Sequence, residues 1–429
     1  MPEIAKTYNP TTVEDRWYEY WEKNKIFHSE IDPTKKPYTI VIPPPNITGM
    51  LTMGHILNNT IQDILIRMKR MQGYNACWVP GTDHASIATE TKVVKHLKDK
   101  GIEKDAIGRE EFLEHCQEWK TTYGGIIIQQ LRKLGVSCDW ERERFTMDDH
   151  YYRKVIETFV DLYNEGKIYR GYRMVNWDPS SKSAISDEEV LFRQVNGKLW
   201  YFRYPVKDSQ EFVVVATTRP ETMLGDSGVA VNPADERYQH LIGKTLCLPL
   251  TDREIPVFAD EYVDPAFGTG AVKVTPAHDF NDHDMGKRHG LEFINIFHPN
   301  AVSNDNVQEK YRNLDRYDLR KLVVEDMQAA GLVEKIEEYQ NNVGYSERGN
   351  VPIEPYMSEQ WFMKMDELAK PALEAVKNGE IRFHPSHWVK TYEHWMNGIN
   401  DWCISRQLWW GHRIPVWYHN ETKEVYCGV

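Results

Sequence analysis

A strand, a helix and a second strand near the N-terminus constrain the fold of this chain more than any other feature. Residues 38–42 form an apolar, β-branched run typical of a buried strand, and a helical stretch follows over residues 54–71. Gly73 is expected to end the helix, and the apolar run 76–79 predicts a strand parallel to the first. The segment therefore predicts a βαβ unit in an α/β protein. The apolar positions of the helix recur at three-and-four spacing, at Leu57, Ile61, Ile64, Leu65 and Met68.

The tryptophan residues divide the chain into three parts. After Trp200 none occurs until Trp361, and seven of the fourteen lie between Trp361 and Trp417. Within the tryptophan-free middle, residues 211–217 are rich in β-branched side chains, and residues 268–275 are typical of a glycine turn that enters a strand. We therefore predict three segments: 1–189, a β-rich inserted domain over 190–348, and 349–429.

Length and composition limit the class of protein. A chain of 429 residues is too long for one ordinary core and indicates two or three domains. Its apolar runs are too short to cross a membrane and its N-terminus lacks a signal-like stretch, so we expect a cytoplasmic protein with no membrane partner. The formal net charge of −12 opposes bulk attraction to nucleic acid, so RNA would have to meet local basic clusters such as Arg67, Lys69 and Arg70.

The cysteines predict neither a disulfide framework nor a zinc site. They are scattered without any CxxC pair, so they are expected to be reduced and mostly buried, and no metal is predicted. The six positions are Cys77, Cys116, Cys138, Cys247, Cys403 and Cys427.

A glycine and a histidine open the predicted helix. The residues Pro-Pro-Pro-Asn-Ile-Thr-Gly at 43–49 leave the first strand, and Gly54 and His55 follow at the helix start. A helix N-terminus offers free N–H groups and a positive dipole end, which suits phosphates. Taken alone, this pair favours a capping or core histidine. Together with its surroundings, the segment resembles the His-x-Gly-His signature of the class I aminoacyl-tRNA synthetases, in the form found in their valine-specific members.

The resemblance covers essentially the whole chain. It continues through four further blocks, at residues 78–85, 176–179, 217–222 and 404–412. It implies an α/β protein with a Rossmann-like nucleotide-binding fold, interrupted by a β-rich inserted editing domain. It also implies ATP with Mg²⁺ and valine as substrates, the tRNA for valine as partner, and a monomer.

The resemblance assigns an activation site. Gly54 and His55 would hold the ATP phosphates while the valine carboxylate attacks the α-phosphorus. Thr52 stands where the family has its first signature histidine, which keeps a hydroxyl but loses the reach of an imidazole. Asp83 would pair with the substrate ammonium, or would cap a turn after Gly81. Pro44, Asn46 and Trp410 would line the valine pocket, although core packing is the alternative for Trp410.

A second site is expected because valine and threonine are nearly isosteric, a limit on pocket selectivity for which the valine-specific enzymes are the standard example. Residues 217–222 and 268–279 resemble the editing signatures of the valine, isoleucine and leucine enzymes. Arg219 and Lys273 would hold the RNA 3′ end or polarise the ester. Asp279 and Asp282 would accept hydrogen bonds from an ammonium and a threonine hydroxyl, or would be caps of a helix that starts there. The implied editing residues are Arg219, Thr222, Lys273, Thr275, Asp279 and Asp282.

Two features of the family do not occur before Val429, namely a lysine-rich loop of the Lys-Met-Ser-Lys-Ser type and a helical anticodon-binding region. The chain is therefore expected to be a fragment with poor activation activity. Zinc-binding cysteine pairs of some relatives are also missing at residues 178–181 and 345–348. The alternatives are an isoleucine-specific enzyme, a non-catalytic tRNA-binding relative and a nucleotidyltransferase. The blocks at 82–85 and 409–412 favour the valine form.

Overall fold

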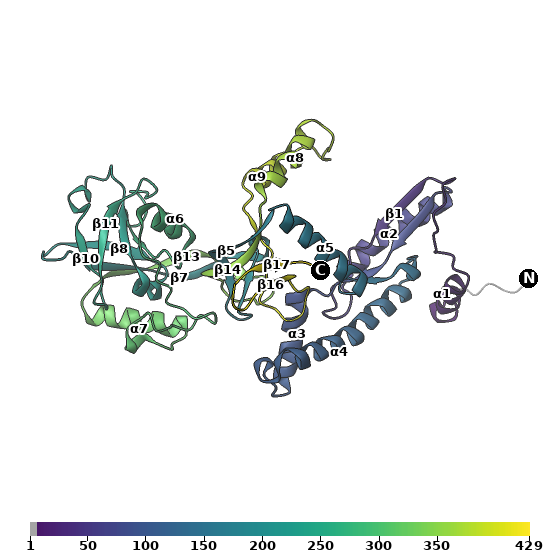
Figure 1. The fold of residues 1–429 in the computed structure, drawn as a ribbon, viewed down its shortest axis with the longest axis horizontal. Helices are drawn as coiled ribbons and strands as arrows, with labels where there is room; N and C mark the ends of the chain where they lie inside the picture. Colours follow the sequence, from purple (N-terminus) through teal and green to yellow (C-terminus); the bar gives the residue numbers. More distant parts are fainter. Residues whose placement is uncertain (1–6) are drawn as a thin grey trace, which may run out of the picture. The chain divides into compact units, whose positions relative to one another are not determined.

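The computed structural model of the chain describes residues 7–429 and divides into two compact units (Figure 1). The first unit runs to Glu165 and also includes Leu408–Val429, whereas the second is Gly166–Gln407. Both contain helices and strands, as an α/β protein requires. None of the helices within residues 7–429 has the length and apolar character needed to cross a membrane.

The predicted βαβ segment is confirmed in the first unit. β1 (Pro37–Val41) and β2 (Asn75–Val79) pair in parallel, and α2 (Met53–Met71) connects them. Gly73 follows the helix with a φ of +81°, a conformation that glycine adopts without strain. The other elements of this unit are α1 (Glu14–Lys23), β3 (Gly81–Thr82), α3 (Ser86–Asp99), α4 (Lys104–Lys133, with a break at Gly108), β4 (Arg144–Phe145), α5 (Asp149–Asn164), β16 (Val416–Tyr418) and β17 (Val425–Cys427), with short 3-10 turns at η1 (Pro10–Thr12) and η2 (Trp140–Arg142).

The apolar spacing of α2 does not correspond to a buried face. Its buried positions are Asn59 and Ile66, and Ile66 packs with Trp78 of β2 in the core of this unit. The residues at three-and-four spacing are exposed to extents between 37% and 64%, namely Leu57, Ile61, Ile64, Leu65 and Met68. Spacing therefore predicted the helix, but the helix turns another side towards the core.

The orientation of α2 predicts different stability losses for substitutions on its exposed and buried sides. Ile61→Ala is expected to change the unfolding free energy by less than about 0.5 kcal/mol, because Ile61 is 53% exposed. Ile66→Ala is expected to cost about 2–5 kcal/mol, because Ile66 is fully buried. Urea unfolding of both variants measures the difference. Equal losses would show that the Ile61 side of α2 is packed in solution.

Three sheets form the second unit. β10 (Thr245–Cys247), β11 (Glu254–Ala259), β9 (Gly228–Val231) and β12 (Ala271–Val274) form one sheet in that order. A second sheet has the order β13 (Val333–Ser346), β7 (Val190–Pro205), β8 (Phe212–Thr217), and a third has the order β15 (Trp402–Cys403), β14 (Glu354–Met363), β5 (Ile168–Asp178), β6 (Ser183–Ile185). The helices are α6 (Phe280–His289), α7 (Arg316–Ala329), α8 (Asp366–Lys377) and α9 (Trp388–Asn397), with 3-10 turns η3 (Asp187–Glu189), η4 (Pro220–Gly225), η5 (Gln239–Leu241) and η6 (Glu309–Tyr311).

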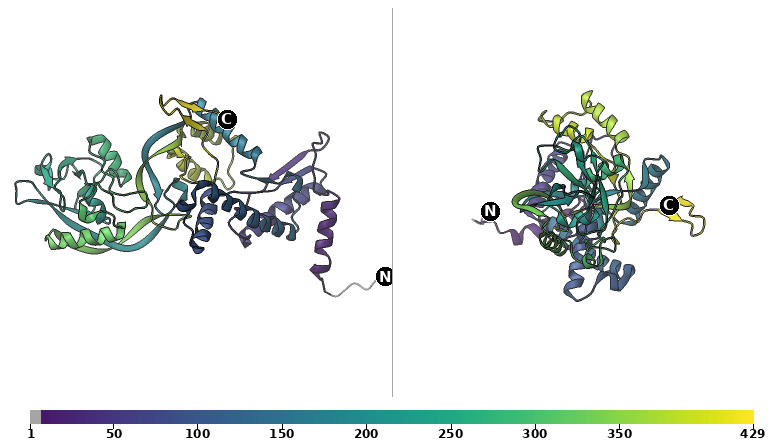
Figure 2. Two further views of the ribbon diagram at one scale, coloured as in Figure 1. Left: turned by 60° about the horizontal axis from the view of Figure 1, so that its bottom comes forward. Right: turned by 90° about the vertical axis from the view of Figure 1, so that its left-hand side faces the viewer.

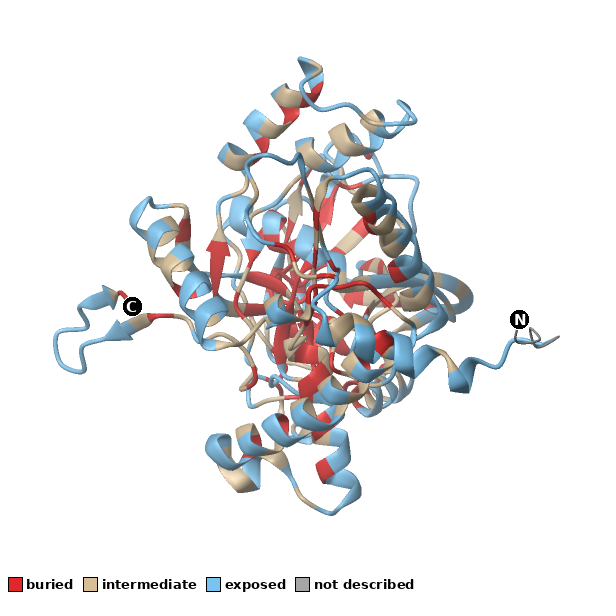
Figure 3. Cartoon of the chain, turned by 90° about the vertical axis from the view of Figure 1, so that its right-hand side faces the viewer, coloured by how far each residue is buried: buried red, intermediate tan, exposed pale blue. Residues whose placement is uncertain are grey.

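The predicted strands of the middle segment are present as β8 and β12. β7 and β13 pair in antiparallel fashion from Val190 opposite Ser346 to Phe202 opposite Val333, and Figure 2 shows them as two long neighbouring strands. Side chains from β7, β8, β9 and α7 fill the largest apolar core, which includes Phe202, Val215 and Val229. Figure 3 shows buried residues in red along the strands and the outward sides of helices in pale blue. The boundaries 190 and 348 of an inserted domain remain a prediction.

Candidate functional site

In the first unit, the loop after β1 lies directly against the segment after β3. The Asp83 N–H donates to Pro45 O at 2.9 Å, and the Ile47 N–H donates to Asp83 O at 3.1 Å. Asn46 and Asp83 are therefore paired as an isolated parallel bridge. Two of the predicted substrate-binding residues, far apart in the sequence, are thus neighbours.

The Asp83 carboxylate is well supplied with hydrogen-bond donors. Its Oδ1 accepts the Thr146 hydroxyl at 2.9 Å and the Ala85 N–H at 3.2 Å, and His84 Nδ1 lies 3.3 Å away. Burial acts to raise the pKa of Asp83, but these interactions lower it overall. The carboxylate therefore stays ionised near neutral pH. The hydrogen bond from the Ala85 N–H makes Asp83 the turn cap that the sequence also allowed. Asp83 has this structural role whether or not it also binds a substrate.

Trp410 adjoins the same segment. Its indole N–H donates to the His84 carbonyl at 2.9 Å, and its backbone N–H donates to the buried Glu90 carboxylate at 3.0 Å. It is only 4% exposed and packs in one cluster with Ile47. This tryptophan is therefore packed in the core and also contacts His84, the residue that follows Asp83.

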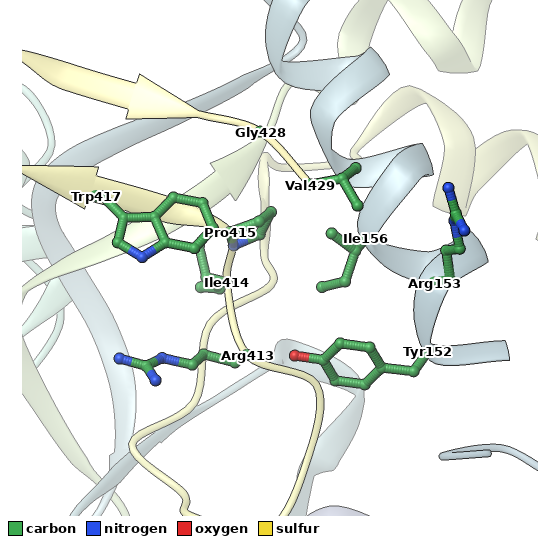
Figure 4. Close-up of a pocket in the computed structure, with 9 residues that line it drawn as sticks. All are labelled: Tyr152, Arg153, Ile156, Arg413, Ile414, Pro415, Trp417, Gly428 and Val429. Atoms are coloured by element: carbon green, nitrogen blue, oxygen red, sulfur yellow. The ribbon is translucent and has the colours of Figure 1, made fainter. Parts of the chain in front are cut away.

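A cavity of about 250 Å³ lies near this group, between α5 and the C-terminal segment (Figure 4). Tyr152 lines the cavity, and its ring is 5.4 Å from the ring of His412. His412 in turn lies 5.0 Å from the His84 ring and hydrogen-bonds Thr146 O at 2.9 Å. Burial, followed by the nearby His84, lowers the pKa of His412. The cavity itself contains none of the predicted site residues.

At the start of α2, Thr52 and His55 contact each other. The Thr52 N–H donates to His55 Nδ1 at 3.0 Å, and the Thr52 hydroxyl lies 2.8 Å from the same nitrogen. Because Nδ1 accepts a backbone N–H, the neutral ring carries its proton on Nε2. His55 is thus the capping histidine that the sequence allowed, and its Nε2–H has no acceptor among residues 7–429.

The remaining predicted residues of this unit lie at the surface. Pro44 and Gly54 are both exposed, and a Cβ at Gly54 would meet only Thr52 Oγ1, at 3.6 Å. The basic cluster is less open than the sequence suggested. The Arg70 guanidinium donates to the Ser137 carbonyl at 2.8 Å, and Arg67 donates to Asp63 and to the Gly135 carbonyl. These arginines are occupied within the protein.

In the second unit, Lys273 on β12 and Thr275, the residue just after β12, converge with Asp282 on α6. The Lys273 ammonium contacts the Thr275 hydroxyl, and the Thr275 N–H donates to Asp282 Oδ2 at 2.8 Å. All three residues are buried. Burial raises the pKa of Asp282 to about 7, with the charge of Asp279 adding to the rise and Lys273 opposing it. Asp282 therefore binds a proton more readily than an exposed aspartate does.

Arg219 belongs to a buried ionic network. Its guanidinium pairs with Glu354 and with Glu221, the latter at 3.2 Å, and it donates to the His278 carbonyl at 3.0 Å. Glu221 also accepts two hydrogen bonds from Arg320, and Glu354 pairs with Arg316. The Thr222 hydroxyl donates to the Arg219 carbonyl at 3.0 Å. The network connects η4 and α7 with β14.

Asp279 takes the role of a helix cap. It precedes α6, is exposed, and its Oδ1 accepts the N–H groups of Asn281 and Asp282 at 2.8 and 3.1 Å. This is the structural alternative that the sequence left open. Asp282 is not a cap, because it is buried and its carboxylate accepts the N–H of Thr275, the residue just after β12.

Sequence reasoning did not identify three carboxylates of this region, namely Asp226, Glu221 and Glu354. Glu221 stands inside the recognised 217–222 block, but its partner Arg320 is 99 residues away. Glu354 meets Arg219 across 135 residues. A buried glutamate inside a recognised motif would have indicated an ion pair with a distant arginine. Burial, however, cannot be seen in a sequence.

No group of three or more His, Cys, Asp or Glu side chains suited to a metal occurs among residues 7–429. This finding concerns side chains and not bound metal, so the absence of zinc is still a prediction. Three cysteines are buried, two are half-buried and Cys247 is exposed, so the expectation of mostly buried thiols holds only in part.

Residues 16–429 match the family of class I tRNA synthetases (I, L, M and V). A curated protein of Porphyromonas gingivalis named Valine--tRNA ligase is 58% identical over 417 residues, which cover 97% of this chain and 47% of that protein. Proteins of the same name from Parabacteroides distasonis and Clostridium tetani are 57% and 56% identical, covering 99% and 98% of this chain and 48% of each relative. The chain spans about half the length of these curated relatives.

Proposed function

We propose, since this chain belongs to the class I tRNA synthetases (I, L, M and V), that it is part of a valine–tRNA ligase. The reaction would join valine to the tRNA for valine at the expense of ATP. The observation that carries the proposal is the convergence of Asn46, Asp83 and Trp410 in the first unit. An ionised carboxylate there is the group that a valine ammonium requires.

For the nucleotide, we propose that the start of α2 binds the phosphates. The Thr52 N–H holds His55 with Nε2–H free to donate, and the open space at Gly54 allows a phosphate to approach the helix N-terminus. Mg²⁺ would be bound mainly by the phosphates of ATP. Thr52 thus positions His55 through its backbone, which a histidine at the same position would also do.

His55→Ala is expected to weaken ATP binding about tenfold, because one hydrogen bond to a charged group is worth about 1.5 kcal/mol. Calorimetry with ATP measures the affinity, and circular dichroism should be unchanged. Thr52→His is expected to leave the affinity unharmed or to raise it. An unchanged affinity in His55→Ala would remove His55 from the site, and a marked loss in Thr52→His would show that the threonine hydroxyl is required.

We further propose that residues 190–348 form an editing domain, which hydrolyses threonine attached to the tRNA. Water would add to the ester carbonyl carbon, and the bond to the ribose oxygen would break to release threonine and a free hydroxyl. The Lys273 ammonium would stabilise the developing oxyanion. Asp282 Oδ1, which has no hydrogen bond among residues 7–429, would accept the threonine hydroxyl. Valine would leave that oxygen without a partner.

The test is deacylation of threonyl-tRNA by this chain at low salt, with valyl-tRNA as the matched substrate. Low salt is needed because phosphate contacts weaken steeply with ionic strength. We expect faster hydrolysis of the threonyl ester and loss of that preference in Asp282→Ala. Equal rates for the two esters, or a preference that Asp282→Ala leaves intact, would contradict the assignment.

A further inference from the structure

We propose that Asp226 is a positioning residue of the second site, because its carboxylate holds the Lys273 ammonium and the Thr275 hydroxyl in one fixed arrangement. This inference rests on the editing function proposed above and adds a residue to its site. Asp226 itself would not touch the substrate.

The backbone brings Asp226 to this place. Asp226 follows η4 and precedes β9, and β9 pairs in antiparallel fashion with β12, which carries Lys273. The Ser227 N–H donates to Val274 O at 2.9 Å and continues the pairing beyond the end of the strand. The carboxylate of Asp226 therefore lies beside the Lys273 and Thr275 side chains.

Both oxygens of the Asp226 carboxylate are hydrogen-bonded to side chains. Oδ1 lies 2.9 Å from the Lys273 ammonium and accepts the Thr275 hydroxyl at 2.6 Å, whereas Oδ2 accepts the Tyr204 hydroxyl at 2.7 Å. Asp226 and Tyr204 have no exposed surface. The Thr275 hydroxyl donates a hydrogen bond to Asp226, and its oxygen accepts a hydrogen bond from Lys273. The three side chains therefore form a closed triangle.

This triangle stabilises the charge of the Lys273 ammonium and limits the number of its N–H groups that can bind a ligand. A buried ammonium is unfavourable unless a counter-charge and hydrogen bonds compensate it, and Asp226 supplies both. Two of the three N–H groups of Lys273 are used inside the triangle, which leaves one for a ligand. Asp282 is close enough for its carboxylate to interact electrostatically with the Lys273 ammonium. We infer that Asp226, by pairing with Lys273, keeps the ammonium away from the carboxylate assigned to the threonine hydroxyl.

The variant that tests this is Asp226→Asn, which keeps the shape and removes the charge. Its control is Asp235→Asn, because Asp235 is also a buried carboxylate of this unit and pairs with Arg237 outside the site. We expect kcat for threonyl-tRNA deacylation to fall about 100-fold in Asp226→Asn with little change in KM, as loss of an oriented oxyanion donor does. Asp235→Asn is expected to lower stability without this loss of kcat.

A second readout does not depend on activity. Titration of ¹³C-labelled aspartate carboxyls by NMR follows Asp282 directly in the full chain. We expect its midpoint to fall by about one pH unit in Asp226→Asn, because a neighbouring negative charge is lost and Lys273 is released, and to stay in place in Asp235→Asn. If both variants behave alike in kcat and in this titration, the proposal is overturned. If the unsubstituted chain shows no threonyl preference, the editing function fails, and the titration alone still decides whether Asp226 controls Lys273.

Discussion

Glu221→Gln is expected to lower the unfolding free energy of the second unit by about 3 kcal/mol, which is in the range for breaking a buried ion pair. The Glu221 side chain has no exposed surface and lies between the guanidinium groups of Arg219 and Arg320. Glutamine keeps an acceptor but removes the charge, so Glu354 alone remains to compensate the three guanidinium groups of Arg219, Arg316 and Arg320. Urea unfolding at neutral pH measures the loss.

The pH dependence of this effect has a definite sign. Burial acts to raise the pKa of Glu221, but the hydrogen bonds and charge of Arg320, then the charge of Arg219, lower it overall below the usual 4.5. A lowered pKa stabilises the folded state above about pH 4.5 and the contribution is lost as the pH falls through the folded value. The difference between Glu221→Gln and the unsubstituted chain should therefore shrink in acid.

The control for this prediction is Glu211→Gln. Glu211 also lies between two basic side chains, Lys244 at 2.9 Å and His240 at 3.4 Å, but it is 47% exposed. Solvent screening makes such an exposed pair contribute much less to stability than a buried one. A loss in Glu211→Gln as large as that in Glu221→Gln would show that burial is not the source of the effect.

Asp282→Asn is expected to stabilise the second unit at pH 8 by up to about 4 kcal/mol. The pKa of Asp282 is raised from 3.8 to about 7, first by burial and then by Asp279, and each unit is worth about 1.4 kcal/mol. A raised pKa favours the folded state below about pH 4, and this advantage is lost as the pH rises through about 7. Asparagine has no charge to bury, and its carbonyl can still accept the Thr275 N–H.

Hydrogen exchange of the amides in β12 and α6 measures this locally at pH 5 and pH 8. The gain should be large at pH 8 and small at pH 5. Asp284→Asn is the control, because Asp284 is exposed on the same helix. A gain in Asp282→Asn that is equal at both pH values would mean that proton binding by Asp282 does not differ between the folded and unfolded states.

Local structure in this chain followed from local sequence. The parallel pair β1 and β2, the connecting helix α2 and the strands β8 and β12 were all predicted from apolar runs, glycines and β-branched residues. The caps also followed local rules, since the side chain of Asp279 precedes α6 and His55 lies in the first turn of α2. Both residues are therefore helix caps, as the sequence allowed, and this does not exclude a further role for either.

Local sequence predicted the strands β1, β2, β8 and β12 and the helix α2, because such elements depend on residues only a few positions apart. It also placed the motif residues at strand and helix ends, through their resemblance to one family. Three-dimensional packing was needed to show that the apolar positions of α2 face outward, that Asp83 lies beside Asn46, and that Asp226 binds Lys273. Those contacts join residues 37 to 47 positions apart, and they form only when packing brings separate strands together and removes water from the charges between them.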